Sequence, residues 1–174
     1  MRILLHACCG PCSTTCLEDL LGEGHEVTLF YSDSNIYPYE EFEKRGAYLK
    51  QVAEHYHVDY VIDSWDHEDW LDAVSKVDGY QGMGEGLGRC SACFSFNLKR
   101  AEKWAKEHGF DGFATTLTVS RFKNSSQIFE SAKDLDGFLC MDFKKHDGFS
   151  RSCRLARELC LYRQSYCGCE FSRH

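Results

Sequence analysis

The stretch R-I-L-L-H-A-C-C-G-P-C, residues 2–12, decides the fold. Its first six residues form an apolar run that is typical of a strand in the middle of a parallel sheet. Pro11 suits the first turn of a following helix, where a missing N–H costs little. Three thiols therefore come directly after a buried strand, at the sheet edge where α/β proteins bind their ligands.

The rest of the chain alternates between strand and helix patterns. We expect strands at 2–7, 26–31, 59–62, 110–116 and 138–141, and helices at 11–21, 39–57, 67–77, 90–108, 122–135 and 152–162. Such alternation predicts an α/β fold with a parallel, Rossmann-like sheet and helices on both faces. We expect one domain over residues 1–174, with a flexible glycine-rich loop at 78–89 and a polar loop at 116–120.

Composition narrows the class of protein. No apolar run among the 174 residues approaches the roughly 20 needed to span a bilayer, so we expect no membrane association. The N-terminus lacks the layout of a signal peptide, which indicates a cytoplasmic protein. The 11 cysteines are an odd number in a chain with long helical segments, and this argues against a secreted disulfide scaffold. Metal or redox chemistry is favoured instead.

The net charge of −7 is unevenly distributed. Residues 1–120 carry a net charge of −10, whereas residues 121–174 carry +3, from 10 Lys/Arg and 7 Asp/Glu. A basic C-terminal third on an acidic protein is typical of a surface for an anionic partner, although an ordinary solvated face has the same composition.

The first two cysteine groups allow three interpretations. Cys9 and Cys12 match a thioredoxin-like dithiol at a helix N-terminus, which predicts a dithiol reductase. Together with Cys90 and Cys93 they also match a four-thiolate zinc site, although their separation is far longer than in zinc ribbons. Adjacent Cys8 and Cys9 point in different directions, which suits two corners of an iron–sulfur cluster that Cys90 and Cys93 complete.

The third group is Cys167-Gly168-Cys169, near the C-terminus. Glycine supplies the backbone freedom that a small disulfide ring requires. Such a ring is strained and readily reduced, so the pair has the character of an electron relay on a mobile tail. A pair of metal ligands remains the alternative.

Taken together, the motifs resemble one family, the cobalamin-independent epoxyqueuosine reductases of the QueH type. The matching stretches are H-A-C-C-G-P-C at 6–12, Y-S-D-S-N-I-Y-P-Y-E-E-F-E-K-R at 31–45, R-C-S-A-C-F at 89–94, T-T-L at 115–117 and Y-R-Q-S-Y-C-G-C at 162–169. Two departures affect neither cysteine pair: Arg121 follows Ser120 where the family usually has proline, and Asn97 stands where it usually has arginine.

The resemblance implies a nucleotide-hydrolase-like (HUP) fold and the reduction of epoxyqueuosine to queuosine at the wobble position of tRNA. This reaction is the last step of queuosine biosynthesis. By the same resemblance, Cys8, Cys9, Cys90 and Cys93 ligate a [4Fe-4S] cluster, and Cys167 and Cys169 form a redox-active disulfide. A second iron is also implied, with Cys12 and Asp33 as its candidate ligands.

The tRNA partner agrees with the basic C-terminal third. We expect phosphate contacts from Lys123, Lys144, Lys145, Arg151, Arg154, Arg157 and Arg163. A flipped base would stack on Tyr37 or Tyr39. A zinc-stabilised tRNA-binding module and a thioredoxin-like dithiol reductase are the alternative functions. The sequence identifies neither the electron donor nor the oligomeric state.

Overall fold

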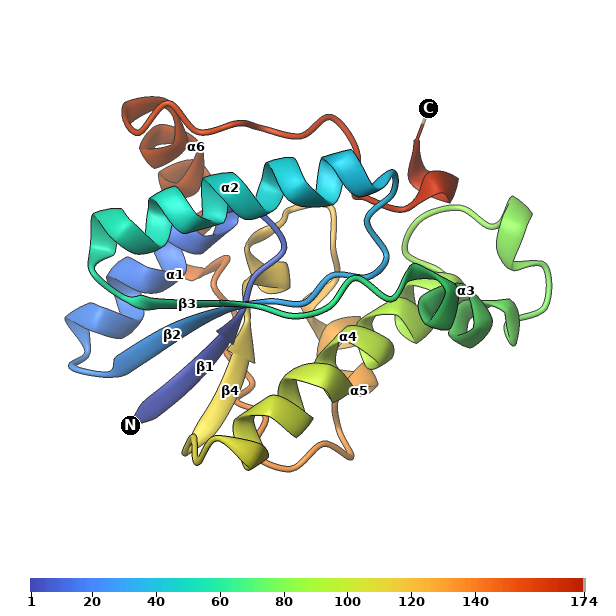
Figure 1. Cartoon of the computed structure of the whole chain (residues 1–174), viewed down its shortest axis with the longest axis horizontal. Coiled ribbons are helices and arrows are strands. Elements are labelled where there is room, and N and C mark those ends of the chain that lie inside the picture. Colours follow the sequence, from blue (N-terminus) through green and yellow to red (C-terminus); the bar gives the residue numbers. More distant parts are fainter. Residues whose placement is uncertain (174) are drawn as a thin grey trace.

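A single parallel sheet of four strands organises the molecule (Figure 1). The computed structural model describes residues 1–173. The strands lie in the order β3-β2-β1-β4, so the first strand is central, as its apolar sequence predicts. Their bounds are β1 Arg2–His6, β2 Glu26–Tyr31, β3 Asp59–Ile62 and β4 Gly112–Thr115.

Six helices connect and cover these strands. They are α1 Gly10–Gly22, α2 Tyr39–Tyr56, α3 His67–Ser75, α4 Gly88–Glu107, α5 Ser125–Ser131 and α6 Gly148–Glu158. Short 3-10 turns lie at Tyr80–Gly82, Thr116–Val119, Lys145–Asp147 and Glu170–Ser172. No described helix is long and apolar enough to cross a membrane.

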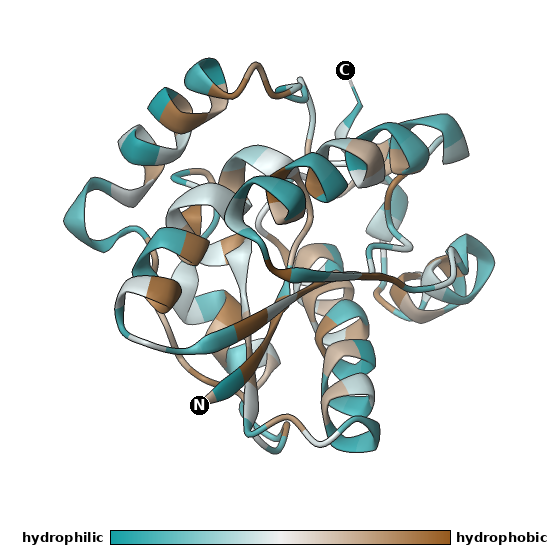
Figure 2. Ribbon diagram, turned by 60° about the vertical axis from the view of Figure 1, so that its left-hand side comes forward, coloured by the Kyte–Doolittle hydropathy of each residue, from teal (hydrophilic) through white to brown (hydrophobic). Residues whose placement is uncertain are grey.

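The strands separate two hydrophobic layers because their side chains alternate between the faces of the sheet. Ile3 and Leu5 of β1 pack with α1 and α2 in one core, whereas Leu4 packs with α4 and α5 in the other. Figure 1 accordingly shows α1, α2 and α6 on one side of the sheet and α3, α4 and α5 on the other. Brown, hydrophobic residues follow the strands in Figure 2, while the helices carry teal residues on their outer surfaces. The predicted α/β fold with helices on both faces is confirmed.

Strand order also fixes where a ligand site forms. The chain proceeds outward from β1 to β3 and then returns to place β4 on the other side of β1. A reversal of this kind leaves a crevice at the carboxyl ends of β1 and β4. Residues that follow β1 and β4 therefore meet at that crevice, although they lie more than a hundred positions apart in the sequence.

The expected fifth strand at 138–141 is wrong. Phe138 forms only an isolated parallel bridge with Phe113, flanked by hydrogen bonds from Phe113 N to Gly137 O and from Leu139 N to Phe113 O. The chain then turns away, because Met141 N bonds back to Leu139 O at 2.8 Å. A short apolar run was thus sufficient for one contact with the edge of the sheet and not for a ladder.

Two segments that we expected to be irregular are fixed by specific contacts. The segment 116–120 begins with a buried 3-10 turn, which Thr115 caps by accepting a hydrogen bond from Leu117 N. In the glycine-rich loop, the Gln127 amide donates to Gly86 O and Leu87 O at 3.0 and 3.3 Å. Helix α5 is shorter than predicted because Asn124 caps it, and α6 begins and ends four residues earlier than predicted.

Gly148 gives a direct test of the packing of α6. A Cβ at this position would overlap the carbonyl oxygen of Phe143, which is backbone and cannot swing aside. We expect Gly148→Ala to lower the free energy of unfolding by about 3 kcal/mol, measured by chemical denaturation. Gly22→Ala at the end of α1 is the control, because its Cβ meets nothing within 4 Å. Equal stability of the two variants would contradict the placement of α6.

Candidate redox and metal site

Three thiols cluster where β1 passes into α1. Cys9 takes an extended conformation (φ −163°, ψ 160°) as the cap residue of α1, which turns Cys8 and Cys12 toward the same region. The sulfur atoms of Cys8 and Cys9 lie 4.0 Å apart, and Cys8 Sγ lies 3.9 Å from the hydroxyl of Thr116, just after β4. The segment that joins β1 to α1 thus brings thiols to the crevice between β1 and β4.

Their mutual hydrogen bonds make the three thiols chemically unequal. Hydrogen bonds from Cys12 and Cys8 lower the pKa of the Cys9 thiol well below its usual value. Hydrogen bonds with Cys12 and Cys9, together with burial, raise the pKa of the Cys8 thiol well above its usual value. Cys9 is therefore the first of the three to become a thiolate, the form that binds metals.

Asp33 brings a carboxylate to this group from the loop after β2. It is 2% exposed, and its Oδ1 lies 3.3 Å from Nε2 of the fully buried His6. His6 is held in turn by Thr115 of β4, 2.9 Å from its Nδ1. The second carboxylate oxygen of Asp33 is buried and has no hydrogen-bond partner.

Helix α4 presents Cys90 and Cys93 near its N-terminus, about one helical turn apart. The backbone N–H of Gly86 donates to the Cys90 sulfur at 3.3 Å, and the Asn97 amide donates to the Cys93 sulfur at 3.7 Å. Burial raises the pKa of the Cys93 thiol well above its usual value, and nearby Cys167 adds to that effect. An isolated Cys93 would thus stay protonated until a cation arrived.

The C-terminal tail carries Cys167 and Cys169, and the tail is held in place. The buried guanidinium of Arg45 donates to the carbonyl oxygens of Cys167 and Tyr166 at 2.8 and 3.0 Å. It also pairs with Glu41 at 2.8 Å. This corrects the expectation of a mobile tail. Both cysteines are free thiols in the structure.

Gly168 explains how the tail fits so closely. Its φ of +149° lies in a region that side chains rarely adopt, and a Cβ there would come within 3.0 Å of Ile36 and 3.2 Å of the Asn35 amide. Its carbonyl also accepts a hydrogen bond from Tyr37 N at 2.9 Å. The glycine between the two cysteines therefore serves close packing against the loop after β2.

Two adjoining cavities collect these groups. The β1 cavity, about 540 Å³ counted to its open mouth, is lined by Cys8, Cys12, Asp33, Cys93 and Cys167, among others. The α4 cavity, about 520 Å³ on the same measure, is lined by Cys90, Cys93, Cys167 and Cys169. Cys93, Cys167 and Lys123 belong to both linings, so the two spaces meet at these side chains.

Of the predicted ligands and redox cysteines, Cys9 is the least accessible, with 1% of its surface exposed, and it lines neither cavity. Within residues 1–173, no three His, Cys, Asp or Glu side chains converge on a position suited to one metal ion. The thiols are spread along both cavities instead.

Comparison with known protein families identifies the family of the chain. The model of the family described as "Epoxyqueuosine reductase QueH" matches residues 3–174. The chain belongs to this family.

Individual relatives agree with this membership. A protein named epoxyqueuosine reductase QueH from Streptococcus pyogenes is 34% identical over 98% of this chain and 69% of its own length. The relative of the same name from Thermotoga maritima is 33% identical over 98% of this chain and 89% of its own length. Among solved structures, the U34-tRNA thiolase NcsA from Methanococcus maripaludis with its [4Fe-4S] cluster covers 91% of this chain and 66% of its own, at 12% identity and a TM-score of 0.43, which is too low to support an argument.

The basic residues that we expected to contact tRNA occupy different environments in this QueH family member. Lys145, Arg154, Arg157 and Arg163 are exposed, and Arg154 lies 3.6 Å from Glu158. Arg151 pairs with Glu18 and Asp19 of α1, and Lys144 donates to Ser125 at 2.7 Å. These last two side chains therefore hold α6 and α5 in place.

Lys123 is half-buried and lines both cavities of the crevice. Burial alone would lower the pKa of its ammonium group, but the neighbouring Cys167 sulfur, to which it hydrogen-bonds, raises that pKa overall. Lys123 is thus a charged group that faces the thiols, a role that its position in the sequence did not reveal.

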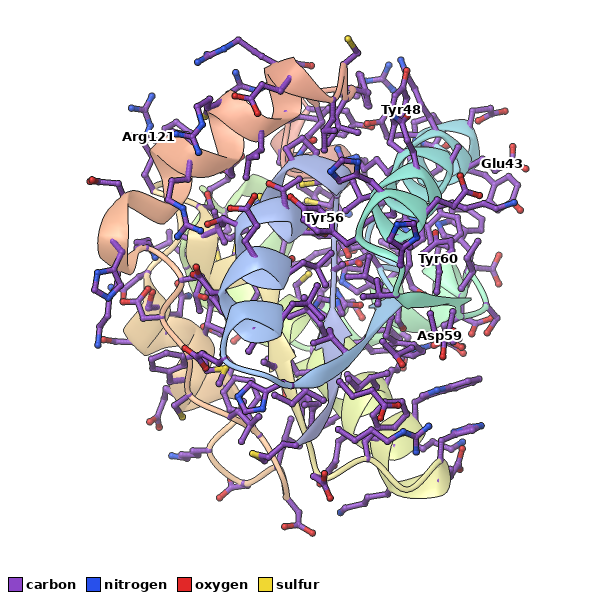
Figure 3. All side chains as sticks on the ribbon, turned by 90° about the vertical axis from the view of Figure 1, so that its left-hand side faces the viewer. Glu43, Tyr48, Tyr56, Asp59, Tyr60 and Arg121 are labelled. Atoms are coloured by element: carbon purple, nitrogen blue, oxygen red, sulfur yellow. The ribbon has the colours of Figure 1, made fainter. Side chains whose placement is uncertain are left out.

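The mouth of the crevice carries an aromatic group that the sequence analysis overlooked. Phe122 is 73% exposed, and the guanidinium of Arg121 lies 4.9 Å from the ring centres of both Phe122 and Phe149. Figure 3 shows Arg121 at the edge of the molecule beside α6. Tyr37 and Tyr39, the aromatics that we expected to stack on a base, are also exposed, by 42% and 44%, but pack against His67 and Trp65.

Proposed function

We propose that the chain reduces epoxyqueuosine to queuosine at the wobble position of tRNA in the cytoplasm, the activity for which its family is named. The observation that supports this function best is the joining of the two cavities. Thiols from the start, the middle and the end of the chain line one continuous crevice at the carboxyl ends of β1 and β4.

The donor set fits a [4Fe-4S] cluster better than a single zinc ion. Four cysteine thiolates hold such a cluster at separate irons, so the ligands need not converge on one point. Cys8 and Cys9 at the end of β1, with Cys90 and Cys93 on α4, are the ligands that we propose. A cluster bound there would supply electrons one at a time.

We also propose a second iron in the β1 cavity, with Cys12 and Asp33 as its candidate ligands from this chain. The supporting observation is the unpartnered Oδ2 of Asp33, a buried carboxylate oxygen that ordinarily would have a partner. A hard oxygen donor beside a soft thiolate suits iron, which would supply a Lewis acid near the substrate oxygen. His6 Nε2 lies 3.3 Å from the other carboxylate oxygen without forming a hydrogen bond to it, so both groups have a free polar atom in this region.

The pair Cys167 and Cys169 supplies a balanced source of reducing equivalents. Opening the epoxide to an alkene and water requires two electrons and two protons, and two thiols that become a disulfide release that number of each. We propose that the two cysteines cycle between the dithiol seen here and a disulfide that an external donor reduces again. Lys123 places its ammonium group within hydrogen-bonding range of the Cys167 sulfur.

The outer groove leads to these groups and would accept the anticodon loop. It is lined by Phe122, Phe149, Lys123 and Arg163 as well as by Cys12 and Cys167. Exposed rings beside cations are typical of surfaces that stack single-stranded bases and contact their phosphates. We propose this groove, together with Lys145, Arg154 and Arg157, as the RNA-binding surface.

The decisive experiment uses the wild-type protein purified and reconstituted without oxygen. We expect it to contain iron in excess of acid-labile sulfide and to convert epoxyqueuosine to queuosine in tRNA, as measured by mass spectrometry of the digested nucleosides. Zinc as the sole metal, with tRNA binding and no turnover, would support the binding module instead. Turnover of protein disulfides without any metal would support the thioredoxin-like reductase.

A further inference from the structure

Arg89 is a buried cation that lacks a compensating anion. The residue is 1% exposed, and its Nη1 donates to the carbonyl oxygens of Tyr80 and Met83 at 2.6 and 2.5 Å. Its Nε and Nη2 have no hydrogen-bond partner. Within the part of the chain that the structure describes, Arg89 forms no ion pair with a carboxylate.

A charge in this position requires a partner. Moving an ion out of water costs several kcal/mol of desolvation free energy. The attraction to a well-placed counter-charge is favourable by a similar amount. The ring of Phe171, 5.1 Å from the guanidinium carbon, contributes only about 0.5–2 kcal/mol. Glu85 lines the same cavity but is exposed to solvent. The missing anion must therefore come from whatever occupies the α4 cavity.

Trp70 adds a second unused donor to the same cavity. The residue is fully buried between His67 and Phe171, with ring centres 5.2 and 6.3 Å away. Its indole N–H forms no hydrogen bond of ordinary geometry, although a buried tryptophan usually does. It does lie within interaction range of the Cys93 sulfur. Trp70 and Arg89 both line the α4 cavity with Cys90, Cys93 and Cys169.

The geometry points to Trp70 and Arg89 as N–H donors to the sulfur atoms of the iron–sulfur site held by Cys90 and Cys93. This inference rests on the proposed function. Hydrogen bonds to cluster sulfurs and nearby positive charge both favour the reduced state, because that state carries one more negative charge. The two residues therefore raise the reduction potential of the site.

The alternative anion, an RNA phosphate, fits these residues poorly. Both side chains are 0–1% exposed, whereas the exposed rings and cations lie at the outer groove. Arg89 also directly precedes Cys90 on the first turn of α4, so its cation is fixed beside the thiolates by the helix itself.

The test is a redox titration of the reconstituted protein followed by electron paramagnetic resonance. Trp70→Phe keeps the ring and removes the N–H; we expect it to disfavour reduction about fivefold, which is roughly 40 mV for a one-electron couple. Arg89→Gln removes the charge and should disfavour reduction at least about tenfold, or roughly 60 mV. Arg89→Lys should fall between Arg89→Gln and the wild type, which a purely structural role would not produce.

Trp104→Phe is the matched control, because Trp104 stacks on Phe30 and His108 in another part of α4 and should leave the potential unchanged. If all variants load the cluster at the wild-type potential, the donor role is wrong and the proposed function stands. If the wild type itself binds no iron and sulfide, the cluster assignment and the donor role are both wrong.

Discussion

The variant Cys90→Ser/Cys93→Ser is expected to bind no iron–sulfur cluster and to lose epoxyqueuosine reduction down to background. Serine has nearly the same size as cysteine but is a poor ligand for iron in such a cluster, and the loss of two of four ligands leaves no stable site. Visible absorbance after anaerobic reconstitution, sulfide content and nucleoside analysis of the tRNA would measure the effect.

A matched control separates this effect from the general loss of thiols. Cys140 and Cys160 are exposed, and neither lines the β1 or the α4 cavity. Cys140→Ser/Cys160→Ser should retain the absorbance and the turnover of the wild type. Full absorbance in the Cys90/Cys93 variant, or its loss in the control, would refute the assignment of ligands.

Arg45→Met is the second change with a large expected effect. Methionine fills a similar volume but removes the ion pair with Glu41 and both hydrogen bonds to the tail. Removing one partner of a buried pair costs about 3–5 kcal/mol, and we expect that loss in the free energy of unfolding. Turnover should fall as well, because Cys167 and Cys169 leave their positions in the cavity wall.

Two measurements distinguish local release of the tail from general instability. Chemical denaturation reports the global effect, and hydrogen exchange of residues near 165–173 reports the tail itself. Lys50→Met on the exposed face of α2 is the control and should change neither quantity. If the tail in the Arg45 variant exchanges as slowly as in the wild type, Arg45 is not what holds it.

The sequence predicted the sheet well because a strong local pattern and a topological rule agreed. The apolar run of β1 placed it in the centre, and strand–helix alternation required parallel neighbours. The fifth strand failed because apolar character alone does not supply a partner: the contact with the sheet edge is limited to one bridge, between Phe138 and Phe113. The early start of α6 was missed because Gly148 at its first position is usually a sign of a turn.

The sequence likewise indicated some residues of the site and not others. The cysteine motifs were recognisable because their spacing is unusual, and the carboxyl ends of the strands brought Cys8, Asp33 and Thr116 together. Arg45 and Arg89 lay within quoted motifs and Trp70 did not, but nothing in the sequence indicated the roles of these three, since arginines on helices are usually solvated and tryptophans usually fill cores. His6 lay within a quoted motif, but its contact with Asp33 depends on the pairing of β1 with β2 and became visible only in the fold.

The crevice draws its thiols from three segments that are distant along the chain, and this has a consequence for folding. A cluster held by residues 8, 9, 90 and 93 would close a loop of about eighty residues, much as a disulfide does, and would bind the folded chain in preference to the unfolded one. Its binding free energy then adds to the stability of the whole sheet. Without the cluster, the same chain would accordingly have a smaller free energy of unfolding and would open more often.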